Sequence, residues 1–191
     1  MTTISIFGKG NMGVAIGGNF EDAGNTVTYI TKETPVEQLG DVVVLAVPYP
    51  AVAGILSAYQ AKLAGKIVID ITNPVNFETF DDLVVPADSS ATAEIAKQLP
   101  DSAVIKAFNT TFAASLATKK VAGEQQTTVL LASDDQKAKE QLTEILEGSD
   151  LAVIDAGSLK RARELEAIGF LQISLASAEK IGWTGGFAVL K

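Results

Sequence analysis

Short apolar runs alternate with segments of helical periodicity along most of the chain, and this alternation constrains the fold more than any other feature. The runs cover residues 3–7, 26–30, 42–47, 67–71, 103–108, 128–132 and 151–154. Several are apolar at every position, as expected of strands that are buried on both faces. The segments between them carry apolar residues at helical spacing, as at Met12, Ile16 and Phe20. The pattern predicts an α/β fold built on a mostly parallel sheet of seven strands covered by helices.

The chain is long enough for one well-buried core. Its 191 residues are 47% hydrophobic, which suits a single folded unit of this size. We therefore expect one domain, residues 1–191, in which residues 159–191 form a C-terminal helical extension. Residues 72–90 are rich in Asp, Pro, Asn and Ser, and they predict a long loop within that domain.

Only the segment 31–40 separates the second apolar run from the third. This connection is too short for the helix and the additional strand that usually complete half of a doubly wound sheet. It therefore predicts a sheet that is truncated at the edge beside the second strand. Within the connection, Thr34, Pro35 and Glu37 have the spacing of a capping box and predict one helical turn.

The charge and the missing residue types exclude several functions. The chain has 23 acidic and 15 basic residues, a net charge of −8 that opposes binding to nucleic acids or to anionic membranes. It has no Cys and no His, so thiol chemistry and the commonest metal ligand are excluded, and we expect no metal site. The N-terminus lacks the basic flank and the long apolar stretch of a signal peptide, which predicts a cytoplasmic protein.

Residues 8–13, GKGNMG, follow the first apolar run and open the first helical segment. A G-x-G-x-x-G loop in this context is typical of dinucleotide-binding folds. Gly8 would permit the tight turn, Gly10 would let the backbone approach a pyrophosphate, and Gly13 would let the helix pack closely on the strand. Free N–H groups at the helix N-terminus would bind the phosphates. The alternative interpretation is that the glycines serve packing alone.

Thr31 lies 18 residues beyond Gly13, close to the position from which a side chain contacts the adenosine ribose. NAD sites usually place a carboxylate there, and a carboxylate would repel the 2′-phosphate of NADP. Here the residues are Thr31 and Lys32, which suit a phosphate, although Glu33 follows directly. They predict NADP as the cofactor. The alternative is that Lys32 is a solvated side chain on a surface turn.

Polar and aromatic residues follow the third, fourth and fifth apolar runs, in the stretches AVPYPAV, DITNPVN and AFNTTFAA. The carboxyl ends of parallel strands meet at one edge of the sheet, where such folds bind ligands. Each residue also has a purely structural interpretation: Tyr49 packs, Asn73 forms a turn before proline, and Asn109 caps the next helix. Lys106 on the fifth run could serve as an acid, but we interpret it as a surface residue and leave it out of the site.

The motifs GKGNMG, AVPYPAV, DITNP, FNTTFA and the late DAG-L run together resemble the NADP oxidoreductase, coenzyme F-420-dependent family over nearly the whole chain. The resemblance implies a Rossmann-like fold and hydride transfer from NADPH to a deazaflavin or flavin-like ring stacked on the nicotinamide. By motif match, Thr31 and Lys32 would contact the 2′-phosphate, and Pro48 and Tyr49 would pack along the cofactor. The chain departs from the family in its short connection at 31–40 and in FNTT, where deazaflavin-reducing members typically have a histidine-containing stretch.

The predicted cofactor site combines the glycine loop, the residues after the second strand and the three strand ends. It comprises Gly8, Lys9, Gly10, Asn11, Met12, Gly13, Thr31, Lys32, Val47, Pro48, Tyr49, Asn73, Pro74, Asn109 and Thr110. No catalytic acid or base is assigned, because hydride transfer can rest on the positioning of two rings. Asn109 is a candidate positioning residue, and Phe77 and Phe80 could cover a planar acceptor ring.

Three functions remain open. The leading hypothesis is an NADPH-dependent oxidoreductase whose partner is a small-molecule acceptor: a flavin, a deazaflavin or a quinone. The second is an NADPH-binding module that senses redox state without turnover. The third is an imine or hydroxy-acid dehydrogenase, which would need Lys106 or Tyr49 as a proton donor. An apolar stripe at Leu165, Ile168 and Leu171 further predicts a homodimer formed through the C-terminal segment.

Overall fold

The computed structural model describes residues 1–190, and its centre is a seven-stranded sheet with the order β2-β1-β3-β4-β5-β8-β9. Strands β1 to β5 are parallel, β8 is antiparallel to β5, and β9 is parallel to β8. The mostly parallel α/β sheet is therefore confirmed. The strands are β1 Thr3–Phe7, β2 Thr26–Ile30, β3 Val42–Leu45, β4 Ile67–Asp70, β5 Ala103–Lys106, β8 Thr128–Ala132 and β9 Ala152–Gly157, with a separate hairpin of β6 Lys120–Val121 and β7 Gln125–Gln126.

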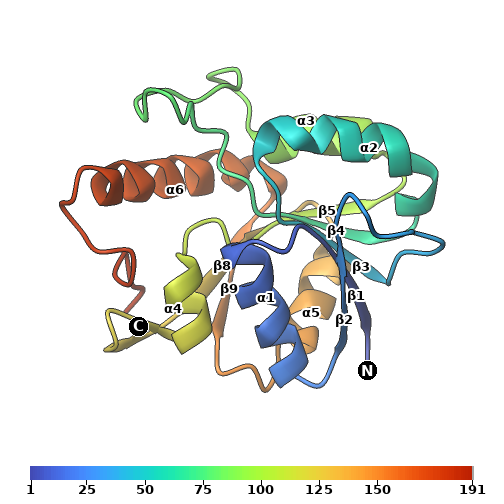
Figure 1. Ribbon diagram of the computed structural model, residues 1–191, viewed down its shortest axis with the longest axis horizontal. Coiled ribbons are helices and arrows are strands. Elements are labelled where there is room, and N and C mark those ends of the chain that lie inside the picture. Colours follow the sequence, from blue (N-terminus) through green and yellow to red (C-terminus); the bar gives the residue numbers. More distant parts are fainter. Residues whose placement is uncertain (191) are drawn as a thin grey trace.

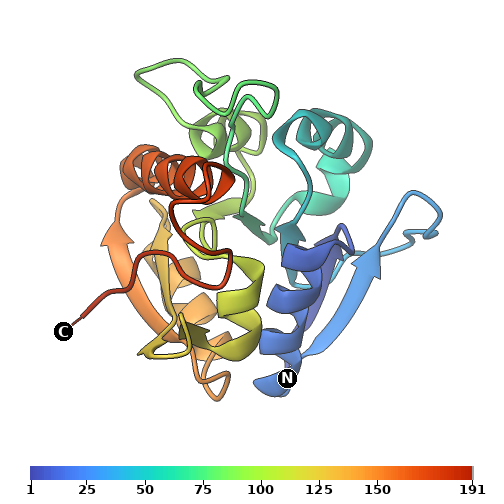
Figure 2. The same cartoon turned by 60° about the vertical axis from the view of Figure 1, so that its left-hand side comes forward.

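Helices cover both faces of this sheet (Figure 1 and Figure 2). The helices on one face are α1 Asn11–Asp22, α4 Ala113–Thr118 and α5 Gln136–Ile145, and those on the other are α2 Tyr49–Leu63 and α3 Ala91–Gln98. Successive residues of the central strands alternate between the two apolar cores. Val43 and Val68 pack under α2 and α3, whereas Val44 and Ile69 pack under α1, α4 and α5. This double burial explains why the runs are apolar at every position.

The third, fourth and fifth strands end one or two residues earlier than the sequence predicted. After β3, the Ala46 carbonyl lies against Gly8. After β4, the Asp70 carboxylate accepts the N–H of Thr72 at 2.9 Å, and after β5 Phe108 adopts a φ of +64°. These local contacts turn the chain out of the sheet at the edge where ligands bind in such folds.

Strand β2 lies at the edge of the sheet, and no strand of the described chain lies beyond it, which confirms the predicted truncation. The connection from β2 to β3 contains no helix within residues 31–41, so the predicted helical turn at Thr34, Pro35 and Glu37 is wrong. The Thr34 hydroxyl instead accepts the N–H of Thr31 at 3.0 Å. This local bond uses the side-chain oxygen that the capping box would have needed.

The C-terminal part of the chain begins with a short 3-10 helix, Leu159–Arg161, and continues as α6, Ala162–Ser177. Residues 178–190 form turns and coil rather than helix, so the predicted extension is helical only as far as Ser177. The Ser115 hydroxyl of α4 donates to the Gly185 carbonyl at 3.1 Å, and the Phe187 N–H donates to Gln172 Oε1 at 2.7 Å. These bonds hold the segment against α4 and α6. No helix within residues 1–190 is long and apolar enough to cross a membrane.

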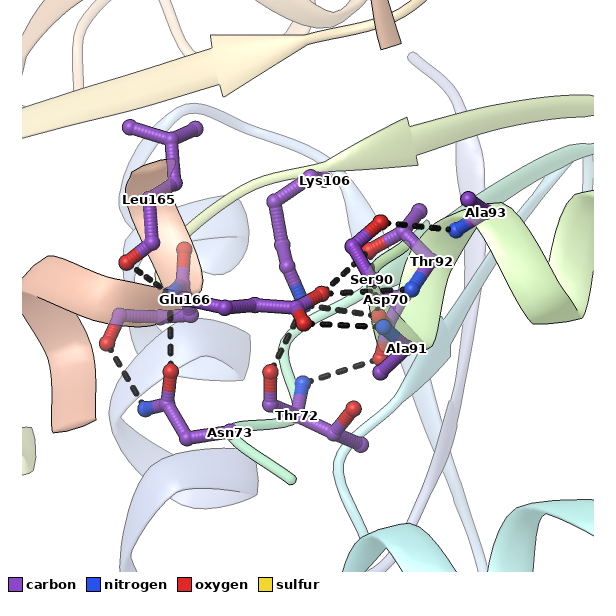
Figure 3. Close-up of polar contacts among 11 residues, drawn as sticks. Asp70, Thr72, Asn73, Ser90, Ala91, Thr92, Ala93, Lys106, Leu165 and Glu166 are labelled. Atoms are coloured by element: carbon purple, nitrogen blue, oxygen red, sulfur yellow. Dashed lines mark hydrogen bonds and ion pairs between the residues drawn. The ribbon is translucent and has the colours of Figure 1, made fainter. Parts of the chain in front are cut away.

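Lys106 is fully buried at the end of β5, so its interpretation as a surface residue is wrong. Its ammonium nitrogen lies 2.7 Å from Asp70 Oδ2 and 3.0 Å from Glu166 Oε1, and it donates to the Thr72 carbonyl at 2.6 Å (Figure 3). A lysine ammonium group has three N–H donors, so each donor has an acceptor. Asp70 and Lys106 are paired in the register of β4 and β5. The sequence signal for this contact was the opposite charges at the ends of two successive apolar runs.

Both carboxylates of this charge cluster, which consists of Lys106, Asp70 and Glu166, have further donors. Glu166 accepts the N–H groups of Ala91 at 2.8 Å and of Thr92 at 3.2 Å, the first residues of α3. Asp70 accepts the Thr92 hydroxyl at 2.7 Å. A carboxylate at the N-terminus of a helix is stabilised by the free N–H groups and by the helix dipole. The charge cluster therefore joins α6 to α3, β4 and β5.

We expect Lys106→Met to lower the free energy of unfolding by about 3–5 kcal/mol, because Asp70 and Glu166 would remain buried without a cation. The matched control is Lys97→Met, which removes a surface ion pair whose lysine side chain is 67% exposed and should cost little. Urea denaturation of both variants measures the difference. Equal losses of stability in the two variants would contradict the structural role of the cluster.

Candidate functional site

A cavity of about 560 Å³ opens beside the carboxyl ends of β1, β3, β4 and β5. Strands β1 and β3 are neighbours, whereas β2 lies on the far side of β1, so the chain leaves β1 and β3 in different directions. Open α/β sheets bind ligands at such a point. The lining residues are Gly10, Asn11, Met12, Ala46, Val47, Pro48, Tyr49, Ile71, Thr72, Asn73, Phe77, Asn109, Thr111, Phe112, Ala113, Ala114, Ile173 and Trp183.

The three glycines of the loop after β1 have different surroundings. A Cβ on Gly8, where φ is +104°, would lie 2.2 Å from the Ala46 carbonyl oxygen, and one on Gly13 would lie 2.4 Å from the Gly8 carbonyl oxygen. Backbone packing therefore requires both glycines. A Cβ on Gly10 would meet no atom within 4 Å, so the loop is open toward the cavity there. No side chain caps α1, which leaves its first N–H groups available to an anion.

Eight of the fifteen predicted site residues line the cavity. They are Gly10, Asn11, Met12, Val47, Pro48, Tyr49, Asn73 and Asn109. The other seven lie outside the lining, and they are Gly8, Lys9, Gly13, Thr31, Lys32, Pro74 and Thr110. The residues brought together come from the carboxyl ends of β1, β3, β4 and β5, which confirms the predicted meeting of these strand ends.

Thr31 and Lys32 follow β2 and are exposed. The Gly8 N–H donates to the Ile30 carbonyl at 3.0 Å, so the glycine loop and Thr31 are adjacent. Lys9, also exposed, lies over the Tyr29 ring at 5.4 Å. Within the described chain Lys32 forms no ion pair. Its charge is therefore available to a phosphate group beside the loop.

Asn73 and Asn109 bind each other at the ends of β4 and β5. Asn109 Nδ2 donates to Asn73 Oδ1 at 2.8 Å and to the Leu165 carbonyl at 2.8 Å, and Asn73 Nδ2 donates to the Asn109 carbonyl at 3.0 Å. Gly169 makes room for this pair, because a Cβ there would lie 2.2 Å from Asn73 Oδ1. The N-cap of α4 is Phe112, so the interpretation of Asn109 as a helix cap is wrong. The two amides instead join the strand ends to α6.

Two buried polar atoms in residues that line the cavity have no hydrogen-bond partner within the described chain: Thr72 Oγ1 and Asn109 Oδ1. Each of the two residues is only 4% exposed. Unpaired buried polar atoms are uncommon and costly. Both residues line the cavity, so a ligand bound there is the candidate partner for these atoms.

The cavity offers little for acid–base chemistry. Burial, with a smaller contribution from the carboxylates of Glu94, Glu166 and Asp70, raises the pKa of Tyr49 above its usual value. Its phenol is therefore neutral at physiological pH and a weak acid. Lys106 does not line the cavity, and its three donors are occupied. No charged side chain of residues 1–190 is part of the lining.

The sequence identified only part of the aromatic wall. Phe77 lines the cavity as suggested, whereas Phe80 packs against Phe77 with a centroid distance of 5.6 Å and lies outside the lining. The sequence analysis missed Phe112 and Trp183, whose rings lie 5.0 Å apart. Trp183 is the single tryptophan of the chain. Trp183 lies in a segment without helical or strand periodicity, so only its residue type pointed to a place in the site.

Comparison with known proteins gives consistent matches. The family model described as NADP oxidoreductase coenzyme F420-dependent matches residues 31–74. The F420-dependent NADP reductase of Methanocaldococcus jannaschii is 30% identical over 150 residues, which are 76% of this chain and 66% of that protein. Metalloreductase STEAP3 of Rattus norvegicus is 35% identical over 113 residues, 59% of this chain and 22% of that protein.

A solved structure has the same fold. It is that of a candidate F420-dependent NADP-reductase from Arthrobacter sp. FB24, which matches with a TM-score of 0.84 and 23% identity over 100% of both chains. This chain spans about two thirds of the archaeal reductase and about a fifth of the metalloreductase. The match to the family model runs from Thr31 to Pro74 and so includes both Tyr49 and Asn73. From these matches, the chain belongs to the NADP oxidoreductase, coenzyme F420-dependent family.

Proposed function

We propose that the protein is an NADPH-dependent oxidoreductase that passes hydride from the nicotinamide to a flavin-, deazaflavin- or quinone-like acceptor. The observation that carries this proposal is a cavity whose lining combines two kinds of groups. The lining includes the glycine loop with the uncapped N-terminus of α1, and it also includes the aromatic side chains of Phe77, Phe112 and Trp183. The helix N-terminus suits the pyrophosphate of a dinucleotide, and the aromatic side chains suit a planar ring. The archaeal relatives are named F420-dependent NADP reductases, which supports the proposal.

The residues present fit NADPH. The N-terminus of α1 would bind the pyrophosphate beside Gly10, and Thr31 and Lys32 would bind the 2′-phosphate. The unpaired Asn109 Oδ1 and Thr72 Oγ1 match the nicotinamide carboxamide, because a primary amide has N–H donors for the first and a carbonyl acceptor for the second. When bound, NADPH supplies a hydride from its reduced nicotinamide ring.

Hydride transfer to an aromatic ring can rest on positioning, with the accompanying proton taken from water. Pro48 and Tyr49 would hold the nicotinamide from one side, and Asn73 and Asn109 fix the strand ends on the other. A dehydrogenase for imines or hydroxy acids would need a proton donor in the cavity, whereas Tyr49 is a weak acid and Lys106 is occupied. These observations favour the aromatic acceptor.

The proposal includes a homodimer in which the C-terminal segments of two copies cover each other. Leu171 on α6 is 51% exposed, and the segment after it exposes Phe187, Val189 and Leu190 by 45%, 39% and 75%. Exposed apolar side chains that gather on one part of a chain are typical of protein interfaces. Residues 1–191 of each copy would then act as a single cofactor-binding domain. The same proposal places the protein in the cytoplasm, where NADPH is available.

NADPH should bind at least about tenfold more tightly than NADH, a difference of about 1.4 kcal/mol. Lys32→Asp should abolish this preference, because a carboxylate repels the 2′-phosphate, and Thr31→Ala should reduce it less. Fluorescence titration with both cofactors measures the ratio. Lys137→Asp, a charge reversal on the exposed face of α5, is the control that should keep the preference. Equal affinities in the unmodified protein would refute the assignment of this phosphate site.

With NADPH, the purified protein should reduce flavin, deazaflavin or quinone acceptors faster than pyruvate-like or imine substrates. NADPH absorbance follows the reaction. Thr72→Val should weaken NADPH binding by about two- to tenfold, the value of one hydrogen bond, without destabilising the free protein, because the hydroxyl has no partner there.

The control for this variant is Thr127→Val, which removes a buried hydroxyl outside the cavity that donates to the Ser115 carbonyl at 2.8 Å and should lower stability instead. Tight NADPH binding without reduction of any acceptor would leave the non-catalytic NADPH-binding module as the function. Turnover of a keto acid or an imine alone would show that the aromatic-acceptor argument is wrong.

Light scattering at micromolar concentration should give the mass of a dimer. Leu171→Glu should shift it to a monomer, because a carboxylate in the apolar contact would lose its hydration. Val84→Glu is the matched control, since Val84 is equally exposed, at 52%, but lies in the loop 72–90. A monomeric unmodified protein, or a dimer that survives Leu171→Glu, would argue against this interface.

A further inference from the structure

The two lining residues with unpaired polar atoms, Thr72 and Asn109, are held by the charge cluster or by a group directly beside it (Figure 3). For Thr72 the contact is direct. Its N–H donates to Asp70 Oδ1 at 2.9 Å, and its carbonyl accepts the Lys106 ammonium at 2.6 Å. Both backbone polar groups of Thr72 are therefore bound to the cluster, which fixes the backbone that carries the unpaired hydroxyl.

Asn109 is held from the α6 side of the cluster. Its Nδ2 donates to the carbonyl of Leu165, the residue before Glu166, at 2.8 Å, and to Asn73 Oδ1 at 2.8 Å. A backbone carbonyl can only accept, so a turned amide would place Asn109 Oδ1 against the Leu165 oxygen. The amide therefore has one orientation, and its Oδ1 stays an acceptor without a partner in residues 1–190.

The three charged side chains of the cluster are buried, and none of them lines the cavity, so they do not touch a ligand there. Stability alone does not require them, since apolar side chains of similar volume often stabilise a core as well as buried ions do. Apolar contacts tolerate small shifts, whereas a shift in this cluster would leave a charge unpaired. The cluster therefore suits a site whose groups must be held in close alignment.

The order of the strands indicates which end of NADPH meets Thr72 and Asn109. In the proposed function the 2′-phosphate lies beside Thr31 after β2, and the pyrophosphate lies at the N-terminus of α1 after β1. From β1 the sheet continues through β3 to β4 and β5, and Thr72 and Asn109 follow the last two of these strands. A dinucleotide that crosses the ends of these strands therefore brings its nicotinamide to the residues that the cluster holds.

We infer that Lys106 and Glu166 are positioning residues for the nicotinamide end of the cofactor and act through Thr72 and Asn109. This inference rests on the proposed oxidoreductase function. Lys106 acts through the Thr72 carbonyl, and Glu166 acts through the turn of α6 that presents the Leu165 carbonyl to Asn109. The adenosine end is bound at β2 and α1, on the far side of β3, so a change in the cluster should affect the two ends unequally.

Two ligands separate the two ends: NADP+ and adenosine 2′,5′-bisphosphate, which lacks the nicotinamide and its ribose. Glu166→Gln keeps the size of the side chain and removes its charge. It should weaken the binding of NADP+ by about tenfold, the value of one or two hydrogen bonds, and leave the binding of the bisphosphate unchanged. Calorimetric titration of the folded variant with both ligands gives the two ratios. Equal weakening of both ligands, as expected of a general loss of structure, would overturn the inference.

Gly169→Ala tests the same path without changing a charge. A Cβ at Gly169 would lie 2.2 Å from Asn73 Oδ1, so it must displace α6 or the amide pair that α6 holds. The affinity for NADP+ should again fall by about tenfold, with the bisphosphate unaffected. Gly54→Ala on the exposed face of α2 is the matched control, because a Cβ there would meet no atom within 4 Å, and it should change the affinity for neither ligand.

The outcomes separate this inference from the proposed function. If the unmodified protein binds neither NADP+ nor the bisphosphate, the proposed function fails, and the inference fails with it. If both ligands bind and Gly169→Ala leaves the affinity for NADP+ unchanged, the inference alone is overturned. The glycine variant also decides the question if Glu166→Gln does not fold, because it leaves all three charges of the cluster in place.

Discussion

The ammonium group of Lys106 joins elements that lie far apart in the sequence. It is buried with the carboxylates of Asp70 on β4 and Glu166 on α6, and the first N–H groups of α3 complete the bonding of Glu166. A buried ion is costly unless its charge and all its donors or acceptors are paired. Here they are, so a displacement of α6 relative to α3, β4 or β5 would leave a charge unpaired. The cluster thereby gives these four elements one relative position.

The position of α6 in turn sets one wall of the cavity. The residue before Glu166, Leu165, presents its carbonyl to Asn109, and Gly169 in the next turn packs against Asn73. One further turn along α6, Gln172 binds the Thr110 carbonyl and the Phe187 N–H. Ile173 follows directly in the lining. A continuous series of contacts therefore leads from the buried cluster to the segment that carries Trp183.

The sequence predicted the features that depend on near neighbours. The apolar runs identified the seven strands of the main sheet, and the glycine loop and the residues at three strand ends were found because each follows an apolar run directly. Lys106 was misjudged because both of its partners lie far along the chain, and Asp70 becomes its neighbour only when β4 and β5 are aligned. The helical turn at Thr34 failed for the opposite reason, since a closer local partner, Thr31, binds the same oxygen.

The glycine-loop part and the aromatic part of the cavity lining depend on different parts of the chain. The part of the lining proposed for NADPH is built mainly from backbone, namely Gly10 and the N-terminus of α1, and Gly8 packs this loop against the sheet. The aromatic part proposed for the acceptor is built from side chains: Phe77 on a loop, Phe112 at the start of α4, and Trp183 on a C-terminal segment without regular structure. The match to the family model ends at residue 74, before Phe112 and Trp183. Substitutions in these irregular segments can change the acceptor without disturbing the sheet or the charge cluster, so a family can retain one cofactor while its members differ in the compound that they reduce.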